Sequence, residues 1–199
     1  MHAYLIFGDS ITHGRGENPS QGWVGRFKKD FEARQYYNVV YNLGIPGDNS
    51  TQLCNRMRVE CEARIQKNRP DDQFHIVIAI GLNDSKVIQD KPLTTLEKFS
   101  ENITQIIHIA KKHTQRVTII SLTPVVQSKT QNYESTQFTN ERVKKYNEVL
   151  TQIATDTNCT FIDVLSPLLK MQYDKLLDDG LHPNSEGYDA IYTILRDQL

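Results

Sequence analysis

Short and almost uninterrupted apolar runs recur along the chain, and each stops at a glycine, a proline or a polar residue. Residues 3–7 stop at Gly8, and residues 36–43 stop at Gly44. Runs of this length, rich in β-branched and aromatic residues and bounded by turn formers, are typical of β-strands. The pattern predicts five strands, at residues 3–7, 36–43, 74–80, 116–122 and 160–164.

The segments between these runs have a different period. Their apolar residues recur every three or four positions, as Trp23, Phe27 and Phe31 do, which is the spacing of one helix face. We therefore expect Trp23 to pack in the core. The same spacing predicts helices over residues 23–31, 53–65, 96–110, 143–153 and 188–195.

Almost continuously apolar strands that alternate with helices indicate a parallel sheet, because parallel neighbours need crossover connections and the crossover helices cover the sheet. The pattern therefore predicts the α/β class with three layers. No repeat, low-complexity tract or flexible linker divides the sequence, so we expect residues 1–199 to form a single domain. The polar residues 124–137 are expected to be a loop at the carboxyl end of the sheet, where open α/β sheets bind ligands.

The composition narrows the choice of partners. The chain has 23 Lys and Arg against 24 Asp and Glu, so no basic excess attracts nucleic acid, and no nucleic acid partner is expected. No apolar run approaches the roughly 20 residues that cross a bilayer, so we expect no integral membrane association. Residues 1–7 lack the features of a secretory leader, which favours the cytoplasm, although a leader removed earlier would leave no trace.

The cysteines and histidines do not form a recognisable metal or disulfide pattern. Cys54, Cys61 and Cys159 are too few for a disulfide framework and are expected to be buried free thiols. No His-Glu-x-x-His motif is present, so we expect neither a metal nor another cofactor. His13, three residues after Ser10, is interpreted as a loop histidine, with a place beside the site as the alternative.

Chemically useful residues follow the ends of the predicted strands. Ser10 follows the first strand, Gly44 the second and Asn83 the third, while Asp179 and His182 precede the last helix. Because the carboxyl ends of parallel strands meet at one edge of a sheet, we expect these residues to lie close together. The sequence therefore predicts a site at this edge.

The residue types suit acyl transfer. A serine hydroxyl attacks an acyl carbon only when a histidine takes its proton, and a carboxylate orients that histidine. Ser10, His182 and Asp179 are the predicted catalytic residues; Asp178 is the rival carboxylate, but only Asp179 has the three-residue spacing that brings it to His182 on one turn. The backbone amides of Ser10 and Gly44 and the side chain of Asn83 are the predicted oxyanion donors.

Each motif alone also has a structural explanation. Gly-Asp-Ser is a common turn tripeptide, Asn83 is suited to cap a following helix, and Asp179 is suited to a helix N-terminus. Asp9 is expected to bond the local backbone of its turn. The catalytic hypothesis is favoured because all the motifs occur together and each one adjoins a predicted strand or helix.

Four motifs occur in order between residues 8 and 183: Gly8-Asp9-Ser10, Asn42-x-Gly44-x-x-Gly47, Gly81-x-Asn83-Asp84 and Asp179-x-x-His182-Pro183. This set resembles the four blocks of the SGNH hydrolase superfamily, also called GDSL esterases and lipases. The resemblance implies a flavodoxin-like five-stranded parallel sheet in an α/β/α sandwich, a Ser10 nucleophile, the Asp179 and His182 pair, and oxyanion donors from Ser10, Gly44 and Asn83. Ile11 stands where the GDSL name has leucine, which leaves the chemistry unchanged.

The favoured function is hydrolysis of small carboxylic esters through an acyl-enzyme on Ser10. Sugar O-acetyl esters, lysophospholipids and thioesters stay open as alternatives, but the polar residues 124–137 argue against a long apolar acyl tunnel. A non-catalytic phosphate-binding or nucleotide-binding module is the alternative from another class. It is disfavoured because residues 14–19 fail the dinucleotide glycine pattern and no Gly-x-x-x-x-Gly-Lys occurs. A missing Gly-x-Ser-x-Gly elbow argues against an α/β-hydrolase, and the complete catalytic set argues against an idle interaction protein.

Overall fold

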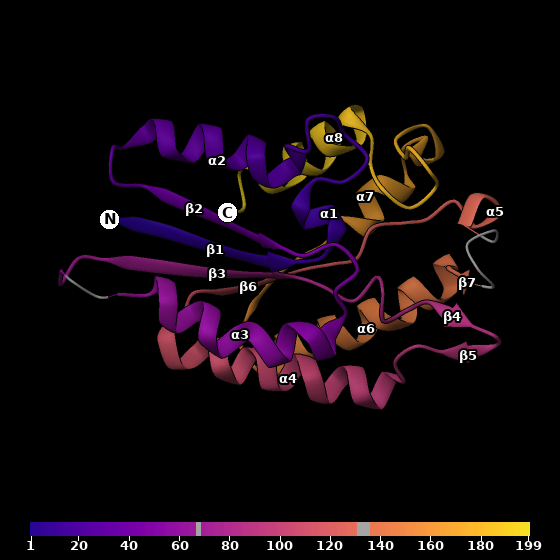
Figure 1. The fold of residues 1–199 in the computed structure, drawn as a ribbon, viewed down its shortest axis with the longest axis horizontal. Helices are drawn as coiled ribbons and strands as arrows, with labels where there is room; N and C mark the ends of the chain where they lie inside the picture. Colours follow the sequence, from indigo (N-terminus) through magenta and orange to yellow (C-terminus); the bar gives the residue numbers. More distant parts are fainter. Residues whose placement is uncertain (67–68, 131–135) are drawn as a thin grey trace.

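The fold is known from a computed structural model that describes residues 1–66, 69–130 and 136–199. Its centre is a five-stranded sheet with the strand order β2-β1-β3-β6-β8, in which every pair is parallel (Figure 1). This order is the flavodoxin-like one, with the strands counted along the chain. The strands are β1 (His2–Gly8), β2 (Val39–Gly44), β3 (Gln73–Ala79), β6 (Val117–Ile120) and β8 (Thr160–Ile162).

The apolar runs form strands because both faces of the sheet are covered. Leu5, Ile6 and Phe7 of β1 are all fully buried, although successive side chains of a strand point to opposite faces. The five predicted strands are confirmed, with shifted ends. The largest shift is at β2, since Tyr36 and Tyr37 are exposed residues of the turn that precedes it.

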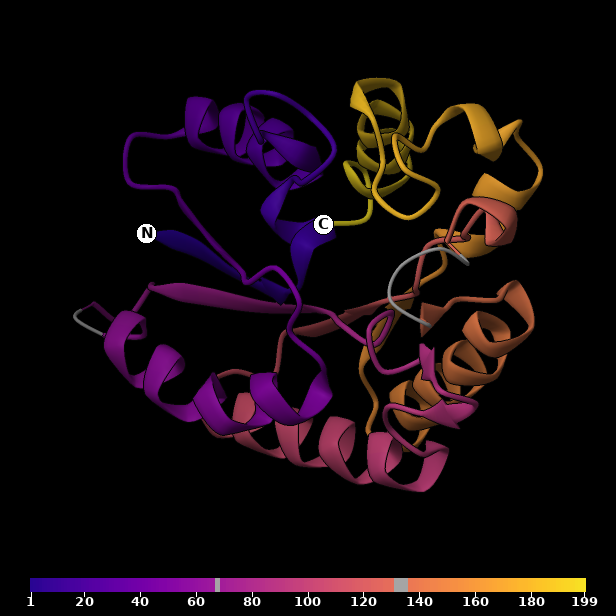
Figure 2. The same cartoon turned by 45° about the vertical axis from the view of Figure 1, so that its right-hand side comes forward.

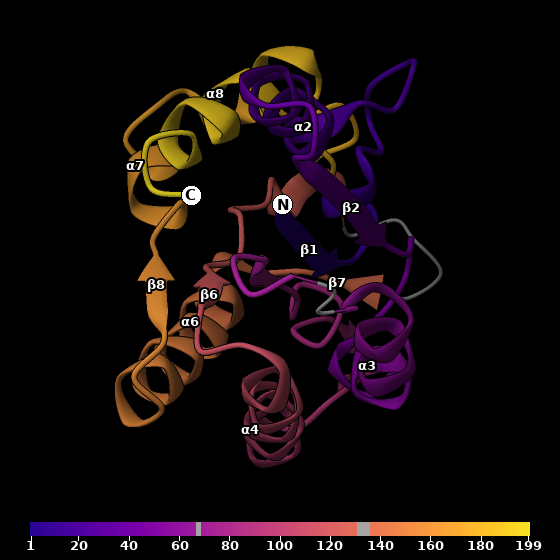
Figure 3. The same cartoon turned by 90° about the vertical axis from the view of Figure 1, so that its left-hand side faces the viewer.

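Helices pack on both faces of the sheet, as Figures 1 and 3 show. One layer holds α2 (Gly22–Arg34) and α8 (Ser185–Leu195), and the other holds α3 (Ser50–Arg64), α4 (Leu96–His113) and α6 (Asn140–Asp156). The predicted three-layer α/β/α class and its five helices are therefore confirmed. Trp23, on α2, is buried as predicted. The described residues also form four short helices that were not predicted: α1 (Ser10–His13), α5 (Gln127–Thr130), α7 (Leu165–Leu169) and the 3-10 helix η1 (Tyr173–Lys175).

A second, small sheet lies beyond the carboxyl ends of the central strands (Figures 1 and 2). It consists of β4 (Val87–Ile88) between β5 (Lys91–Pro92) and β7 (Thr136–Gln137), all antiparallel. The prediction of a plain loop at residues 124–137 is therefore wrong for residues 127–130 and 136–137, which form α5 and β7; residues 131–135 lie outside the described part. The pairing of β7 with β4 depends on a distant segment, which local sequence does not reveal.

The described part of the chain contains no helix that is long and apolar enough to span a membrane. All three cysteines are free, but only Cys61 is buried. The expectation of buried thiols is therefore wrong for Cys54 and Cys159, which are partly exposed.

Candidate active site

Ser10 lies at the junction between strand β1 and helix α1. β1 ends at Gly8, and the carboxylate of Asp9 accepts a hydrogen bond from the Ile11 N–H at 2.9 Å, which caps α1. Ser10 is the first residue of α1, and its carbonyl accepts the N–H groups of Gly14 and Arg15 at 3.0 and 2.9 Å. Its own N–H has no acceptor among the described residues. The turn therefore leaves the Ser10 N–H available to a ligand.

His182 and Asp179 complete a hydrogen-bonded line with Ser10. The Ser10 Oγ lies 2.9 Å from His182 Nε2, and His182 Nδ1 lies 2.7 Å from Asp179 Oδ2. Asp178, the rival carboxylate, is exposed, and it contacts His182 through the backbone, where its N–H donates to the His182 carbonyl at 2.8 Å. The structure therefore brings Asp179, and not the Asp178 carboxylate, to the imidazole.

The second carboxylate oxygen of Asp179 is held by backbone. Asp179 Oδ1 accepts the N–H groups of Leu181 and His182 at 2.9 and 2.8 Å. Burial acts to raise the pKa of Asp179, but these two bonds and the contact with the His182 ring outweigh it and hold the pKa below its usual value. Asp179 is therefore a fixed, ionised acceptor for the Nδ1 side of the imidazole.

The loop that carries His182 is held against the rest of the site. Leu177 and Pro183 form a β-bridge, and the Val126 N–H donates to the Gly180 carbonyl at 2.8 Å. Gly16 packs directly on this loop: a Cβ there would lie 2.3 Å from the Pro183 carbonyl oxygen. Close packing of backbone on backbone therefore fixes the position of His182.

Asn83 lies in the turn that follows β3, with its side chain directed to the loop after β2. Its Nδ2 donates one hydrogen bond to the Asp48 carbonyl at 2.9 Å. Asn83 caps no helix, because the next helix along the chain, α4, begins at Leu96 and is capped by Thr95. The capping alternative is therefore excluded, and the second N–H of the Asn83 amide has no acceptor among the described residues.

Buried polar groups hold this turn in place. The carboxylate of Asp84 accepts the N–H and the hydroxyl of Ser50 at 2.9 and 2.6 Å, and Asn102 Nδ2 donates to Ser50 Oγ at 2.9 Å. Burial raises the pKa of Asp84, and burial also raises that of Asp9 to about 7, with the charges of Asp84 and Asp48 adding to the effect. Sequence reasoning missed Ser50 and Asn102, because only the fold brings α3 and α4 to the turn, whereas the expected bond of Asp9 to the local backbone is confirmed.

Two glycines, Gly44 at the end of β2 and Gly47 in the loop after it, differ in packing and in hydrogen bonding. The N–H of Gly44 donates to Asn42 Oδ1 at 3.0 Å, and a Cβ on Gly44 would lie 2.4 Å from the His13 N. Gly44 is therefore a packing residue with an occupied N–H in this structure, which argues against its predicted role as an oxyanion donor. Gly47 is exposed at φ 87°, has open space where a Cβ would stand, and has an N–H without an acceptor among the described residues. It also precedes Asp48, to which Asn83 is bonded.

Arg56, on α3, ties the loop of Gly47 to the sheet. Its Nε donates to Asp48 Oδ2 at 2.8 Å, and its Nη2 donates to the carbonyls of Leu43 and Gly8 at 2.8 and 3.2 Å. The ion pair is largely buried, with 16% of the Arg56 side chain and 8% of the Asp48 side chain exposed. Arg56 therefore couples the ends of β1 and β2 to the loop beside Asn83.

A cavity of about 250 Å³ lies beside His182 and Asp179. Its other lining residues include Arg15, Lys86 and the apolar Phe138. His13 is exposed and does not line this cavity, but it is the last residue of α1, so its interpretation as a loop histidine is wrong. The described residues contain no group of three or more His, Cys, Asp or Glu that is placed to hold a metal ion.

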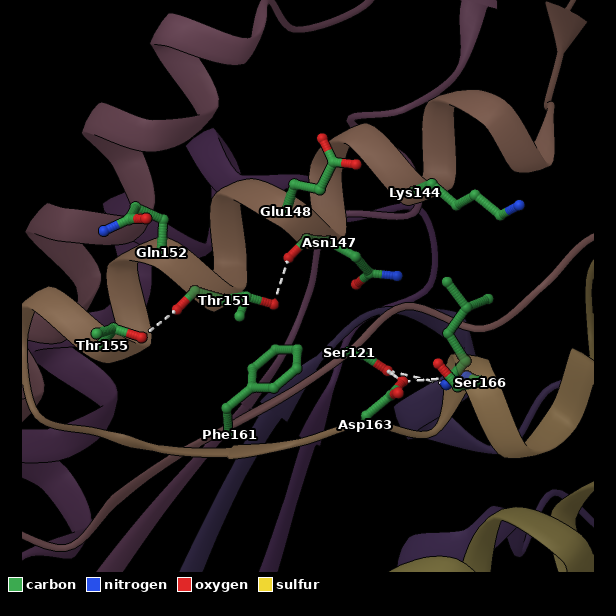
Figure 4. A pocket seen from close by; sticks show the side chains of 11 residues that line it. Ser121, Lys144, Asn147, Glu148, Thr151, Gln152, Thr155, Phe161, Asp163 and Ser166 are labelled. Atoms are coloured by element: carbon green, nitrogen blue, oxygen red, sulfur yellow. Dashed lines mark hydrogen bonds between the residues drawn. The ribbon is translucent and has the colours of Figure 1, made fainter.

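A larger groove of about 400 Å³ lies between α6 and the edge strand β8 (Figure 4). Three of its polar side chains serve the fold: the hydroxyls of Thr151 and Thr155 donate to helix carbonyls, and Asp163 Oδ1 accepts the Ser166 N–H at 3.1 Å. None of the predicted site residues lines it. The cavity beside His182 is therefore the one that adjoins the candidate chemistry.

A serine, a histidine and an aspartate in one hydrogen-bonded line, at the carboxyl edge of a parallel sheet, are the arrangement of hydrolases that attack through a serine. The model of the GDSL-like lipase/acylhydrolase family matches residues 6–190. The chain belongs to this family and is a hydrolase that acts on ester bonds. A search of the curated proteins found no match.

Solved structures show the same fold. The lipase/acylhydrolase from Enterococcus faecalis has a TM-score of 0.78 at 23% identity, and the match covers 100% of this chain and 95% of that one. The acetylxylan esterase Axe2 from Geobacillus stearothermophilus has a TM-score of 0.75 at 21% identity, covering 98% and 93%. The psychrotrophic esterase EstA from Pseudoalteromonas sp. has a TM-score of 0.72 at 22% identity, covering 98% and 94%.

Proposed function

We propose that this protein hydrolyses small carboxylic esters through an acyl-enzyme on Ser10. The observation that carries the proposal is the line from Ser10 Oγ through His182 to Asp179, with contacts of 2.9 and 2.7 Å. His182 Nε2 takes the hydroxyl proton as Ser10 Oγ bonds to the acyl carbon, and the imidazolium then protonates the departing alcohol. Asp179 stabilises the imidazolium and fixes the tautomer.

The acyl-enzyme is hydrolysed by the same groups. His182 takes a proton from water, the hydroxide attacks the acyl carbon, and the proton returns to Ser10 Oγ as the acid leaves. The Ser10 N–H and the free N–H of Asn83 would bind the oxyanion in both steps. We assign the third donor to Gly47 in place of Gly44, because the Gly47 N–H is open while that of Gly44 is bonded to Asn42.

A short acyl group suits the cavity. Its volume of about 250 Å³ is below the ~300–1,000 Å³ of typical drug-sized pockets. Sugar O-acetyl esters fit the same chemistry, and two of the similar folds belong to acetylxylan esterases, so acetylated xylan is a second candidate. We further propose that residues 1–199 are one hydrolase domain, since one buried cluster reaches from Ala3 to Leu195.

The test compares Ser10→Ala with the native protein on p-nitrophenyl acetate, butyrate and palmitate and on acetylated xylan. We expect the native protein to prefer the short esters and Ser10→Ala to lose all esterase activity without loss of fold. Ser166→Ala, which changes an exposed serine on α7, is the matched control and keeps full activity. A Ser10→Ala variant with native turnover would contradict the proposal.

A further inference from the structure

Two cationic side chains line the cavity beside His182. They are Arg15, just beyond α1, and Lys86, just before β4. Among the described residues that line this cavity, the only carboxylate is that of Asp179, which is bound to the His182 ring. The described lining of the cavity therefore carries an excess of positive charge beside His182, the histidine that is bonded to Ser10.

Backbone bonds connect both cations to the residues of the proposed chemistry. The Arg15 N–H donates to the Ser10 carbonyl at 2.9 Å, and the Tyr188 hydroxyl donates to the Arg15 carbonyl at 2.5 Å. The Lys86 N–H points to the Asn83 carbonyl at 3.4 Å, and the Leu93 N–H donates to the Lys86 carbonyl at 2.9 Å. The same turns that place the nucleophile and an oxyanion donor therefore also place the two cations.

The carboxylates close to these turns are already paired. Glu17 accepts two bonds from the guanidinium of Arg26, at 2.7 and 2.9 Å, and Asp48 pairs with Arg56. Neither the Arg15 guanidinium nor the Lys86 ammonium has an ion-pair or hydrogen-bond partner in the described part of the chain. Their charges are therefore free to bind a ligand.

We propose that the natural substrates are anionic esters, with a carboxylate or phosphate group near the scissile bond that Arg15 and Lys86 bind. This inference rests on the proposed esterase function. A guanidinium forms paired bonds with such groups and an ammonium adds a point charge, while the protein wall around the cavity focuses the field of both. The negative group belongs either to the acyl part or to the alcohol part of the ester.

The experiment uses two pairs of esters that differ in charge. On the alcohol side, 4-acetoxybenzoate is compared with its neutral methyl ester; on the acyl side, phenyl hydrogen adipate is compared with phenyl methyl adipate. Each anionic-to-neutral ratio of kcat/KM is divided by the corresponding ratio for hydroxide-catalysed hydrolysis, which removes differences in intrinsic reactivity. The pair that shows a preference identifies the part of the substrate that carries the charge.

We expect about a tenfold normalised preference for the anionic member of one pair at low salt, the size that two partly exposed charge pairs give. The ratio falls towards one in the double variant Arg15→Gln/Lys86→Gln and in about 0.5 M salt. The charge-conserving double variant Arg15→Lys/Lys86→Arg keeps the preference, which separates charge from folding. Lys144→Gln, in the groove of Figure 4, is the control and leaves the ratio unchanged.

Ratios near one for both pairs in the native protein, or a preference that survives Arg15→Gln/Lys86→Gln, would overturn the charge assignment. If Ser10-dependent hydrolysis of the neutral esters persists in that case, the proposed function stands and only the substrate class is wrong. If the native protein hydrolyses none of the four esters, the proposed function fails, and the anionic substrate class fails with it.

Discussion

The substitution Asn83→Ala separates a structural role that is observed from the oxyanion role that we propose for the same side chain. One N–H of its amide holds the Asp48 carbonyl at 2.9 Å, and the other is open to bind an oxyanion. The first role contributes to the fold and the second to the transition state. Alanine removes both donors at once, but each loss appears in a different measurement.

The expected magnitudes differ. Loss of one partly buried hydrogen bond lowers the free energy of unfolding by about 0.5–1.5 kcal/mol. Loss of an oxyanion donor raises the activation free energy by about 2.7–4 kcal/mol, which lowers kcat by roughly 10²–10³. KM stays near its native value, because the bond strengthens only as negative charge develops on the substrate oxygen.

The assay combines steady-state kinetics on a short-chain ester with urea unfolding at the same temperature. Asn38→Ala is the matched control. Its Nδ2 donates to the Phe31 carbonyl at 3.1 Å, in the turn before β2 and away from Ser10. We expect the control to lose a similar amount of stability while its kcat stays native.

The reasoning is refuted if Asn83→Ala loses stability but keeps a native kcat at temperatures where it is folded. Asn83 would then serve only to hold the loop of Asp48. A rise in KM at constant kcat would also contradict the oxyanion role, because it would mean that Asn83 binds the ground state and the transition state equally.

Three further predictions follow from the groups around the site. Arg56→Met leaves Asp48 buried without its partner, so urea unfolding should show a loss of about 3–5 kcal/mol, and native stability would contradict this. The pKa of Asp9 is raised to about 7, so the free energy of unfolding of the native protein falls as pH rises from about 4 to 7. Asp9→Asn removes this dependence. Over this window the free energy of unfolding of Asp9→Asn, relative to that of the native protein, should rise by at most about 1.4 kcal/mol per pH unit. EDTA leaves kcat unchanged, because the proposed mechanism uses only Ser10, His182 and Asp179; a loss of activity that zinc or calcium restores would contradict the mechanism.

The central sheet can be predicted from the sequence because strands that are buried on both faces are almost continuously apolar. All the residues of the run at 3–7 are apolar or aromatic, and the run forms most of β1. The same pattern does not predict β4 and β7, because each strand has only two residues and shows no periodicity. Their pairing also joins segments that are far apart in the sequence. Residue patterns reveal elements that are stabilised locally or by full burial, and miss those that only a distant partner stabilises.

The candidate site divides in the same way. Asp179 and His182 can be paired from their spacing, because the contact lies within one turn. Gly44 illustrates the limit: a motif shows that a glycine is present, but the backbone φ and the packing decide which glycine has a free N–H. In this structure the N–H of Gly44 is bonded to Asn42, while that of Gly47, at φ 87°, has no acceptor among the described residues. The role of Arg56 also cannot be predicted from the sequence, because its bonds join chain segments that come together only in the fold.

The central claim, that Ser10 is the nucleophile, is tested most directly by covalent labelling with a p-nitrophenyl alkylphosphonate. The account predicts that Ser10 Oγ bonds to phosphorus as p-nitrophenolate leaves, that one label is bound per chain, and that activity is lost in proportion. Peptide mass spectrometry should locate the adduct on Ser10, and His182→Ala should label far more slowly because the hydroxyl proton then has no acceptor. A stoichiometric adduct on another residue, or full activity in a chain labelled at Ser10, would contradict it.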